Sequence, residues 1–184
     1  KWQVKDLIQP KGIMCFTGFN KNHAAQFIVN EVSQTFQNQG RKILQITEHE
    51  DLNHDNLWSV EHINVNTTAL KLNMAKLMYK TTEEVQNLIL EKSLGYDQTI
   101  ILNAEFGESI TLAMMAISNL NVICIDTRLT PAKLIEEVDL MAQEYKLPNV
   151  NFAINRVGYN PGFLAEIFRS FRKAISSLTN RNNS

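Results

Sequence analysis

Short, mainly apolar runs alternate with longer amphipathic stretches along this chain, and this alternation limits the fold more than any other feature of the sequence. The runs lie near residues 13–17, 42–46, 98–102, 121–126 and 150–154. Runs of this length and composition are typical of strands buried on both faces, and parallel strands need crossover connections such as helices between them. The sequence therefore predicts one doubly wound α/β domain, with a mainly parallel sheet and helices on both faces.

Local signals predict where the helices begin and end. Thr81 to Glu84 reads Thr-x-x-Glu, which is a capping box at a helix start. Thr130 followed by Pro131 predicts an N-cap and a proline in the first helical position. Further helices are expected over 24–39, 109–120 and 163–178, where apolar residues recur at helical spacing.

Residues 57–80 give a weaker signal than the rest. The segment from His62 to Val65 has the composition of a short strand. The segment from Leu70 to Tyr79 places Leu70, Met74, Leu77 and Met78 at the spacing of one helix face. We therefore expect a short strand followed by a helix here.

Composition bounds the class of protein. The chain has 184 residues, which suits one domain over 1–184, with 1–11 and 180–184 at its periphery. The net charge of −1 argues against a nucleic-acid partner, and the chain lacks an apolar run of the roughly 18 residues that a membrane-spanning helix needs. Cys15 and Cys124 each lie in an apolar run, so both are expected to be buried thiols rather than a disulfide.

Several motifs follow one another in a recognisable order. Residues 13–46 contain a strand, a loop, a helix ending at a glycine, two basic residues and a second strand. Tyr96–Asp97 precedes the strand near 98–102, Thr130–Pro131 follows a later one, and Asn155–Arg156 closes the last. In this order and spacing the chain resembles the P-loop ATPase domain of bacterial tyrosine kinases (BY-kinases), which are relatives of the Min- and Par-type ATPases. The resemblance implies a three-layer, Rossmann-like P-loop fold.

The residues with which that family binds phosphate are replaced in this chain. A P-loop needs glycines so that backbone N–H groups can wrap the phosphates, a lysine to balance their charge, and a hydroxyl to ligate Mg²⁺. The resemblance places Asn22 and Ala24 at glycine positions, Ala25 at the lysine, and Gln26 and Phe27 at the hydroxyl pair. These positions are degenerate.

The family's acidic motifs are missing as well. Thr47 and His49 occupy the Asp-x-Asp positions, and Leu102 occupies the Walker B aspartate, with Asn103 beside it. Phosphoryl transfer depends mostly on electrostatic stabilisation by the metal and the lysine. The resemblance therefore implies a pseudoenzyme with no catalytic residues, no bound metal and no cofactor.

The resemblance also implies a setting. It predicts a kinase-like cytoplasmic domain of an exopolysaccharide or capsule chain-length regulator, at the inner face of the bacterial inner membrane and anchored through a segment upstream of Lys1. Its partners would be copies of itself or components of polysaccharide export and polymerisation. Two alternatives stay open: an active ATPase or tyrosine kinase with a deviant phosphate loop, and a small metabolic or ligand-binding domain of the same fold.

A few polar residues have two readings each. Lys21 could replace the missing lysine or be a solvated loop cation, and Asn155 could contact adenine or satisfy backbone groups. The segment 48–55 contains two histidines and four carboxylates, but its spacing matches no zinc pattern and a solvated loop is preferred. Glu105 and Glu108 could be acid–base groups, although Glu108 also suits a helix start.

The resemblance also implies where association would occur, because members of the family associate through faces near the nucleotide loop. Asn20–His23, Glu105–Glu108 and Arg128 present polar and charged groups there, and Trp2 and Trp58 are candidate interface anchors.

Overall fold

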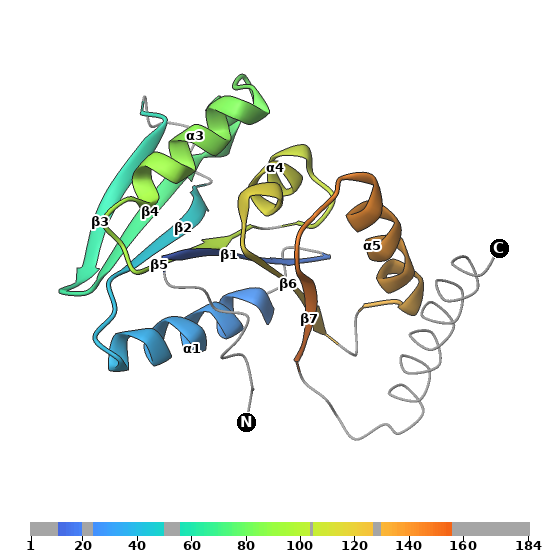
Figure 1. Cartoon of the computed structure of the whole chain (residues 1–184), viewed down its shortest axis with the longest axis horizontal. Coiled ribbons are helices and arrows are strands. Elements are labelled where there is room, and N and C mark those ends of the chain that lie inside the picture. Colours follow the sequence, from blue (N-terminus) through green and yellow to red (C-terminus); the bar gives the residue numbers. More distant parts are fainter. Residues whose placement is uncertain (1–10, 20–23, 50–55, 104, 127–129, 156–184) are drawn as a thin grey trace.

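The computed structural model of the chain describes residues 11–19, 24–49, 56–103, 105–126 and 130–155 (Figure 1). Its strands are β1 (Gly12–Gly18), β2 (Ile43–His49), β3 (Trp58–Asn64), β4 (Thr67–Asn73), β5 (Gln98–Leu102), β6 (Leu120–Asp126) and β7 (Val150–Asn155). Its helices are α1 (Ala24–Asn38), α2 (Met74–Leu77), α3 (Thr82–Ser93), α4 (Ser109–Ile117) and α5 (Ala132–Glu144). All the strands predicted from apolar runs are confirmed, within a few residues.

The strands form one sheet in the order β3-β4-β2-β5-β1-β6-β7. Every neighbouring pair is parallel except β3 and β4, which are antiparallel. The chain leaves β1 through α1 to reach β2 on one side, and leaves β5 through α4 to reach β6 on the other. This doubly wound connectivity confirms the predicted fold class and puts β1 between the two halves.

Helices cover both faces of the sheet, and alternating strand residues divide between the two cores. In β1, Ile13 and Cys15 belong to the core beneath α3, α4 and α5, whereas Met14 and Phe16 belong to the core beneath α1. Figure 1 shows α1 on one side of the sheet and α3 and α4 on the other. Because both faces are covered, β1 is buried along its whole length.

The two cysteines are free and buried, as predicted. Burial raises the pKa of Cys15 to about 12, and the neighbouring Cys124 adds to the rise while a hydrogen bond from Asn103 opposes it. Burial alone raises the pKa of Cys124 to about 12. Both thiols are therefore protonated and unreactive near neutral pH.

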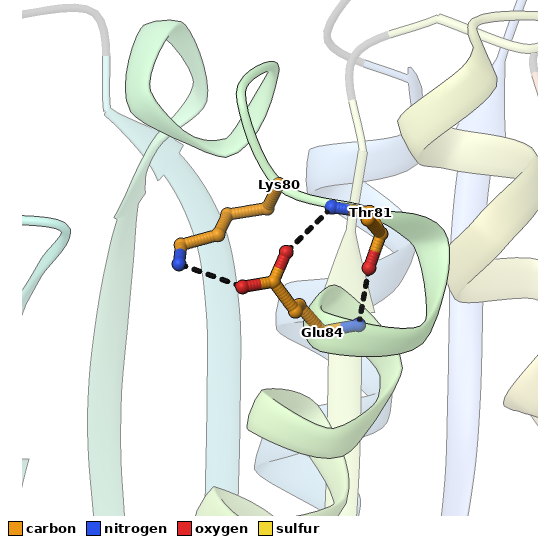
Figure 2. A network of polar contacts seen from close by, with 3 residues as sticks. All are labelled: Lys80, Thr81 and Glu84. Carbon is orange, nitrogen blue, oxygen red and sulfur yellow. Dashed lines mark hydrogen bonds and ion pairs between the residues drawn. The ribbon is translucent and has the colours of Figure 1, made fainter.

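The capping box of α3 is confirmed (Figure 2). The hydroxyl of Thr81 accepts a hydrogen bond from the Glu84 N–H at 3.2 Å, and the Glu84 carboxylate accepts one from the Thr81 N–H at 2.8 Å. The ammonium of Lys80 lies 2.8 Å from the same carboxylate. Hydrogen bonds from Lys80 and from the backbone of Thr81 lower the pKa of Glu84, which keeps the cap charged.

Two predictions about helix ends need correction or stay untested. The N-cap of α5 is Pro131, so the prediction that Thr130 caps this helix is wrong. The Thr130 N–H instead donates to the carbonyl of Asp126 at 2.9 Å. The predicted helix over 163–178 and the peripheral ends 1–10 and 180–184 lie outside the described residues.

The segment 57–80 was predicted wrongly in part. The strand predicted at His62–Val65 is longer and begins at Trp58, and most of the helix predicted from Leu70 is strand β4. Leu70 and Leu72 alternate into the core beneath α3, and Leu70 pairs with Ile46 of β2. Sheet pairing thus overrides an apolar spacing that also suits a helix, and only Met74–Leu77 is helical.

Candidate functional site

The carboxyl ends of the parallel strands meet at one edge of the sheet, which is where ligands bind in folds of this kind. Register brings two of the predicted positions together there. Leu102 pairs with Thr47 on one side and with Phe16 on the other. Thr47 and Leu102, far apart in sequence, are thus neighbours beside the end of β1.

Backbone hydrogen bonds tie the loop after β1 to the loop after β5. The Phe106 N–H donates to the Gly18 carbonyl at 2.7 Å, and the Asn103 N–H donates to the Phe16 carbonyl at 2.9 Å. The rings of Phe19 and Phe106 meet edge to face with their centroids 5.9 Å apart. Both of these backbone amides are therefore paired within the protein.

The buried amide of Asn103 points back into the sheet. Its Nδ2 lies 3.7 Å from the sulfur of Cys15, and the residue is only 2% exposed. Like the Phe19–Phe106 pair, this amide is engaged in a contact within the protein.

The first turn of α1 offers no group suited to a phosphate among its described side chains. Ala25 is 5% exposed and packs in the core with Phe16 and Val29. The Gln26 Nε2 donates to Asn30 Oδ1 at 2.9 Å along the helix surface, and Phe27 is 57% exposed. This helix start therefore presents a buried methyl, a locally paired amide and an exposed ring.

No family model matches this chain, and no curated protein matches it by sequence. Solved structures do match. A ParA family ATPase from Chlorobium tepidum aligns with a TM-score of 0.64 at 12% identity, over 82% of this chain and 76% of that one. The kinase domain of the Escherichia coli tyrosine kinase ETK aligns at 0.61 and 11%, over 85% and 74%. The chain has the fold of Min/Par-type P-loop ATPases and BY-kinase domains.

A third similar structure is a chain of the MinC:MinD cell division protein complex of Aquifex aeolicus, with a TM-score of 0.58 at 10% identity, over 80% of this chain and 70% of that one. Identities this low establish the fold alone, so the chemistry of this P-loop-fold domain has to be argued from its own residues.

The structure describes some of the degenerate P-loop positions and not others. The described side chains of Ala25, Gln26, Phe27, Thr47 and Leu102 carry neither charge nor, apart from Thr47, a hydroxyl. Lys21, Asn22 and Arg128 lie outside the described residues, so what was predicted for them stays a prediction.

Three further positions are described only in their backbone. Ala24 is the first residue of α1. His49 ends β2 opposite Asn73, and Asn155 ends β7 opposite Asp126. The predicted roles of His49 and Asn155 therefore remain predictions.

Among the described residues no group of three or more His, Cys, Asp or Glu side chains could hold a metal ion. Residues 50–55 of the polar segment 48–55 lie outside those residues, so the preference for a solvated loop there is untested. In the described part of the chain, no helix combines the length and apolar character that crossing a membrane requires.

Two hollows in the described surface are lined by residues outside α1 and β1. One, of about 280 Å³, lies between α5 and β7, and burial raises the pKa of Asp139 beside it. The other, of about 290 Å³, lies beside α3 and is lined by Leu57, Lys80 and Glu84 among others. Sequence reasoning missed both, and it also missed the Phe19–Phe106 pair, because no local pattern marks a contact between two loops.

Proposed function

We propose that this chain is a P-loop-fold domain that has lost phosphate chemistry and acts through protein contacts. In this proposal residues 1–184 form one kinase-like domain of an exopolysaccharide or capsule chain-length regulator, at the cytoplasmic face of the bacterial inner membrane. The observation that carries it is Ala25, a buried core methyl at the position where the P-loop family has its phosphate-binding lysine.

Electrostatics supports the loss of catalysis. Positioning and charge stabilisation supply almost all of the rate in phosphoryl transfer, because the protein forms few covalent contacts with the transferred group. Here the lysine position is apolar, the Walker B position is Leu102, and the amides of Asn103 and Phe106 are already hydrogen-bonded to β1 and its loop. These groups would therefore balance little of the negative charge of a bound Mg-ATP.

Contact with another protein is the remaining use of this surface. Relatives of this fold include MinD in a complex with MinC, which supports protein association as a role compatible with the fold. The loops at the carboxyl edge, with Glu105–Glu108, Asn20–His23 and Arg128, are the surface we propose for contact with a second copy or an export component. Glu108 is exposed at the start of α4, so it can be changed with little effect on the core.

Isothermal titration with Mg-ATP tests the first half of the proposal. We expect no measurable heat of binding at micromolar or low millimolar nucleotide. Micromolar binding that is lost on substitution within residues 18–26 would contradict the proposal and favour an active ATPase or tyrosine kinase with a deviant loop.

Charge reversal tests the second half. Glu108→Lys and Arg128→Glu should each reduce association measured by light scattering, on a chain that includes its native upstream segment, and should change polysaccharide length in cells. Glu83→Lys, on the exposed first turn of α3, is the control and should change neither. A wild type that stays monomeric, with polysaccharide length unchanged in both variants, would end the proposal.

A further inference from the structure

Strand β3 is the outermost strand at one side of the described sheet. Among the described residues it pairs with β4 alone, and Figure 1 shows it at the opposite side of the sheet from β7. All its residues from Ser59 to Asn64 are exposed, including Val60 at 55% and Ile63 at 51%. A strand with exposed apolar residues and an unpaired row of backbone groups is suited to pairing with another strand.

Contacts with neighbouring elements hold the first part of β3 in register with β4. Trp58 packs against the core beneath α3, and the Lys92 ammonium lies 4.7 Å from the centre of its ring. Glu61 makes an ion pair with Lys71 of β4 at 2.6 Å. Pairing with β4 is regular from Trp58 to His62, and a bulge follows at Ile63. The segment 58–62 is therefore a regular strand available for pairing with another strand, and the bulge marks its end.

We infer that β3 pairs antiparallel with β3 of a second copy of this chain, with Val60 on the two-fold axis. In such a pair, residues directly opposite each other have their side chains on the same face of the sheet. Because side chains alternate between the two faces, the sequence numbers of opposite residues differ by an even number. With Val60 at the axis, Val60 meets Val60, Ser59 meets Glu61 and Trp58 meets His62. No two like charges are opposite each other.

Neighbouring registers are worse. An axis at Glu61 places two carboxylates directly opposite, and like charges in that position destabilise a strand pair. An axis at Ser59 places the carboxylate of Glu61 opposite Leu57, and an axis at His62 places it opposite Ile63. Of these four registers, only the one centred on Val60 avoids both like charges and a carboxylate opposite an apolar residue. This self-complementarity favours a second copy of the chain over an unrelated extended peptide.

This surface is independent of the loops at the carboxyl edge that carry the proposed function. Val60 lies in the middle of β3, whereas Glu108 starts α4 after the end of β5. The two ideas can therefore fail separately: Val60 variants test this one and Glu108 variants test the other.

Analytical ultracentrifugation of the full chain tests the pairing. Val60→Lys places two ammonium groups opposite each other and removes the apolar contact, so it should weaken self-association by about tenfold or more. Val65→Lys is the control, because Val65 is 99% exposed, lies beyond the bulge and has no place in the register. A wild type that stays monomeric at high concentration, or equal association in both variants, would overturn the inference.

Cross-linking tests the register itself. Val60→Cys should form a disulfide-linked dimer on mild oxidation, as should the double variant Ser59→Cys/Glu61→Cys, while Val65→Cys should not. Cys15 and Cys124 are buried with raised pKa values, so they leave the engineered thiols as the reactive ones. Cross-linking through Val65→Cys as fast as through Val60→Cys would contradict the register, and circular dichroism of each variant confirms that it is folded.

Discussion

Strand β1 at the centre of the sheet and strand β3 at its edge differ in how far they are buried. Strand β1 is buried from Gly12 to Gly18, whereas β3 is exposed from Ser59 to Asn64. At the centre, helices cover both faces, so only apolar or small residues fit. At the edge, one side of the strand has no described neighbour, and both polar and apolar residues occur there. The central strands are therefore specified by burial and the edge strand by its partner.

The largest difference between the two regions should appear in stability. Ile123, in β6, is fully buried in the main core, and Ile123→Ala should lower the free energy of unfolding by about 2–5 kcal/mol because it leaves a cavity. Val60→Ala, in β3, should change it by less than about 0.5 kcal/mol in dilute solution. Urea denaturation measures both, and equal losses would mean that the hairpin edge is more deeply packed than its exposure indicates.

A second difference should appear at alkaline pH. Cys15 has an ordinary pKa of 9.0 when unfolded and a folded pKa raised to about 12, because burial disfavours the thiolate. The folded state therefore keeps a proton that the unfolded state loses, so this stability is fully present below pH 9 and is lost as the pH rises toward 12.

Between pH 9 and pH 11 the wild type should lose about 2 kcal/mol more than Cys15→Ala does, since one pKa unit corresponds to roughly 1.4 kcal/mol. The measurement is urea denaturation at several pH values. Ser59→Ala, in the exposed edge strand, is the control and should follow the wild-type pH profile. Parallel profiles for wild type and Cys15→Ala would show that Cys15 is accessible to solvent.

The helix that joins the two regions should give a smaller effect. Helix α3 contributes Val85 and Ile89 to the core that also contains Leu70 of the hairpin. Thr81→Ala removes the capping hydroxyl and should cost about 1 kcal/mol, whereas Thr82→Ala, at the next exposed position, should cost little. Thermal denaturation compares the two variants, and an equal loss in both would mean that the capping box contributes nothing beyond helix propensity.

The same contrast explains how far the sequence could predict the structure. The runs near 13–17 and 121–126 predicted β1 and β6 because strands buried on both faces must be apolar throughout. Leu70, Met74 and Leu77 suggested a helix because their spacing suits one, and only the pairing of β4 with β2 reveals a strand. Local capping at Thr81 was predictable because all its partners lie within four residues.

The candidate site divides in the same way. The register of β2 and β5 places Thr47 beside Leu102, whereas the assignment of these two residues to the family's acidic positions stays a prediction. The edge-to-face contact of Phe19 with Phe106 joins two loops about 87 residues apart, and no periodicity encodes such a pairing. Contacts between two loops distant in sequence depend on the tertiary structure, so a local sequence pattern does not predict them.

The smallest effect concerns the ion pair on the hairpin. Lys71 donates a hydrogen bond to Glu61 and attracts its charge, and both effects lower the pKa of the Glu61 carboxyl. A lowered folded pKa stabilises the fold above the ordinary pKa of Glu and loses that contribution as the pH falls through the folded value. Because both side chains are exposed, Lys71→Met should leave the denaturation curve nearly unchanged. It should nevertheless return the Glu61 pKa, followed by NMR titration, to its ordinary value, while Lys80→Met should leave it where it is. If Lys71→Met does not move the Glu61 pKa, the ion pair does not persist in solution, and β3 would then carry an unpaired carboxylate beside the proposed two-fold axis.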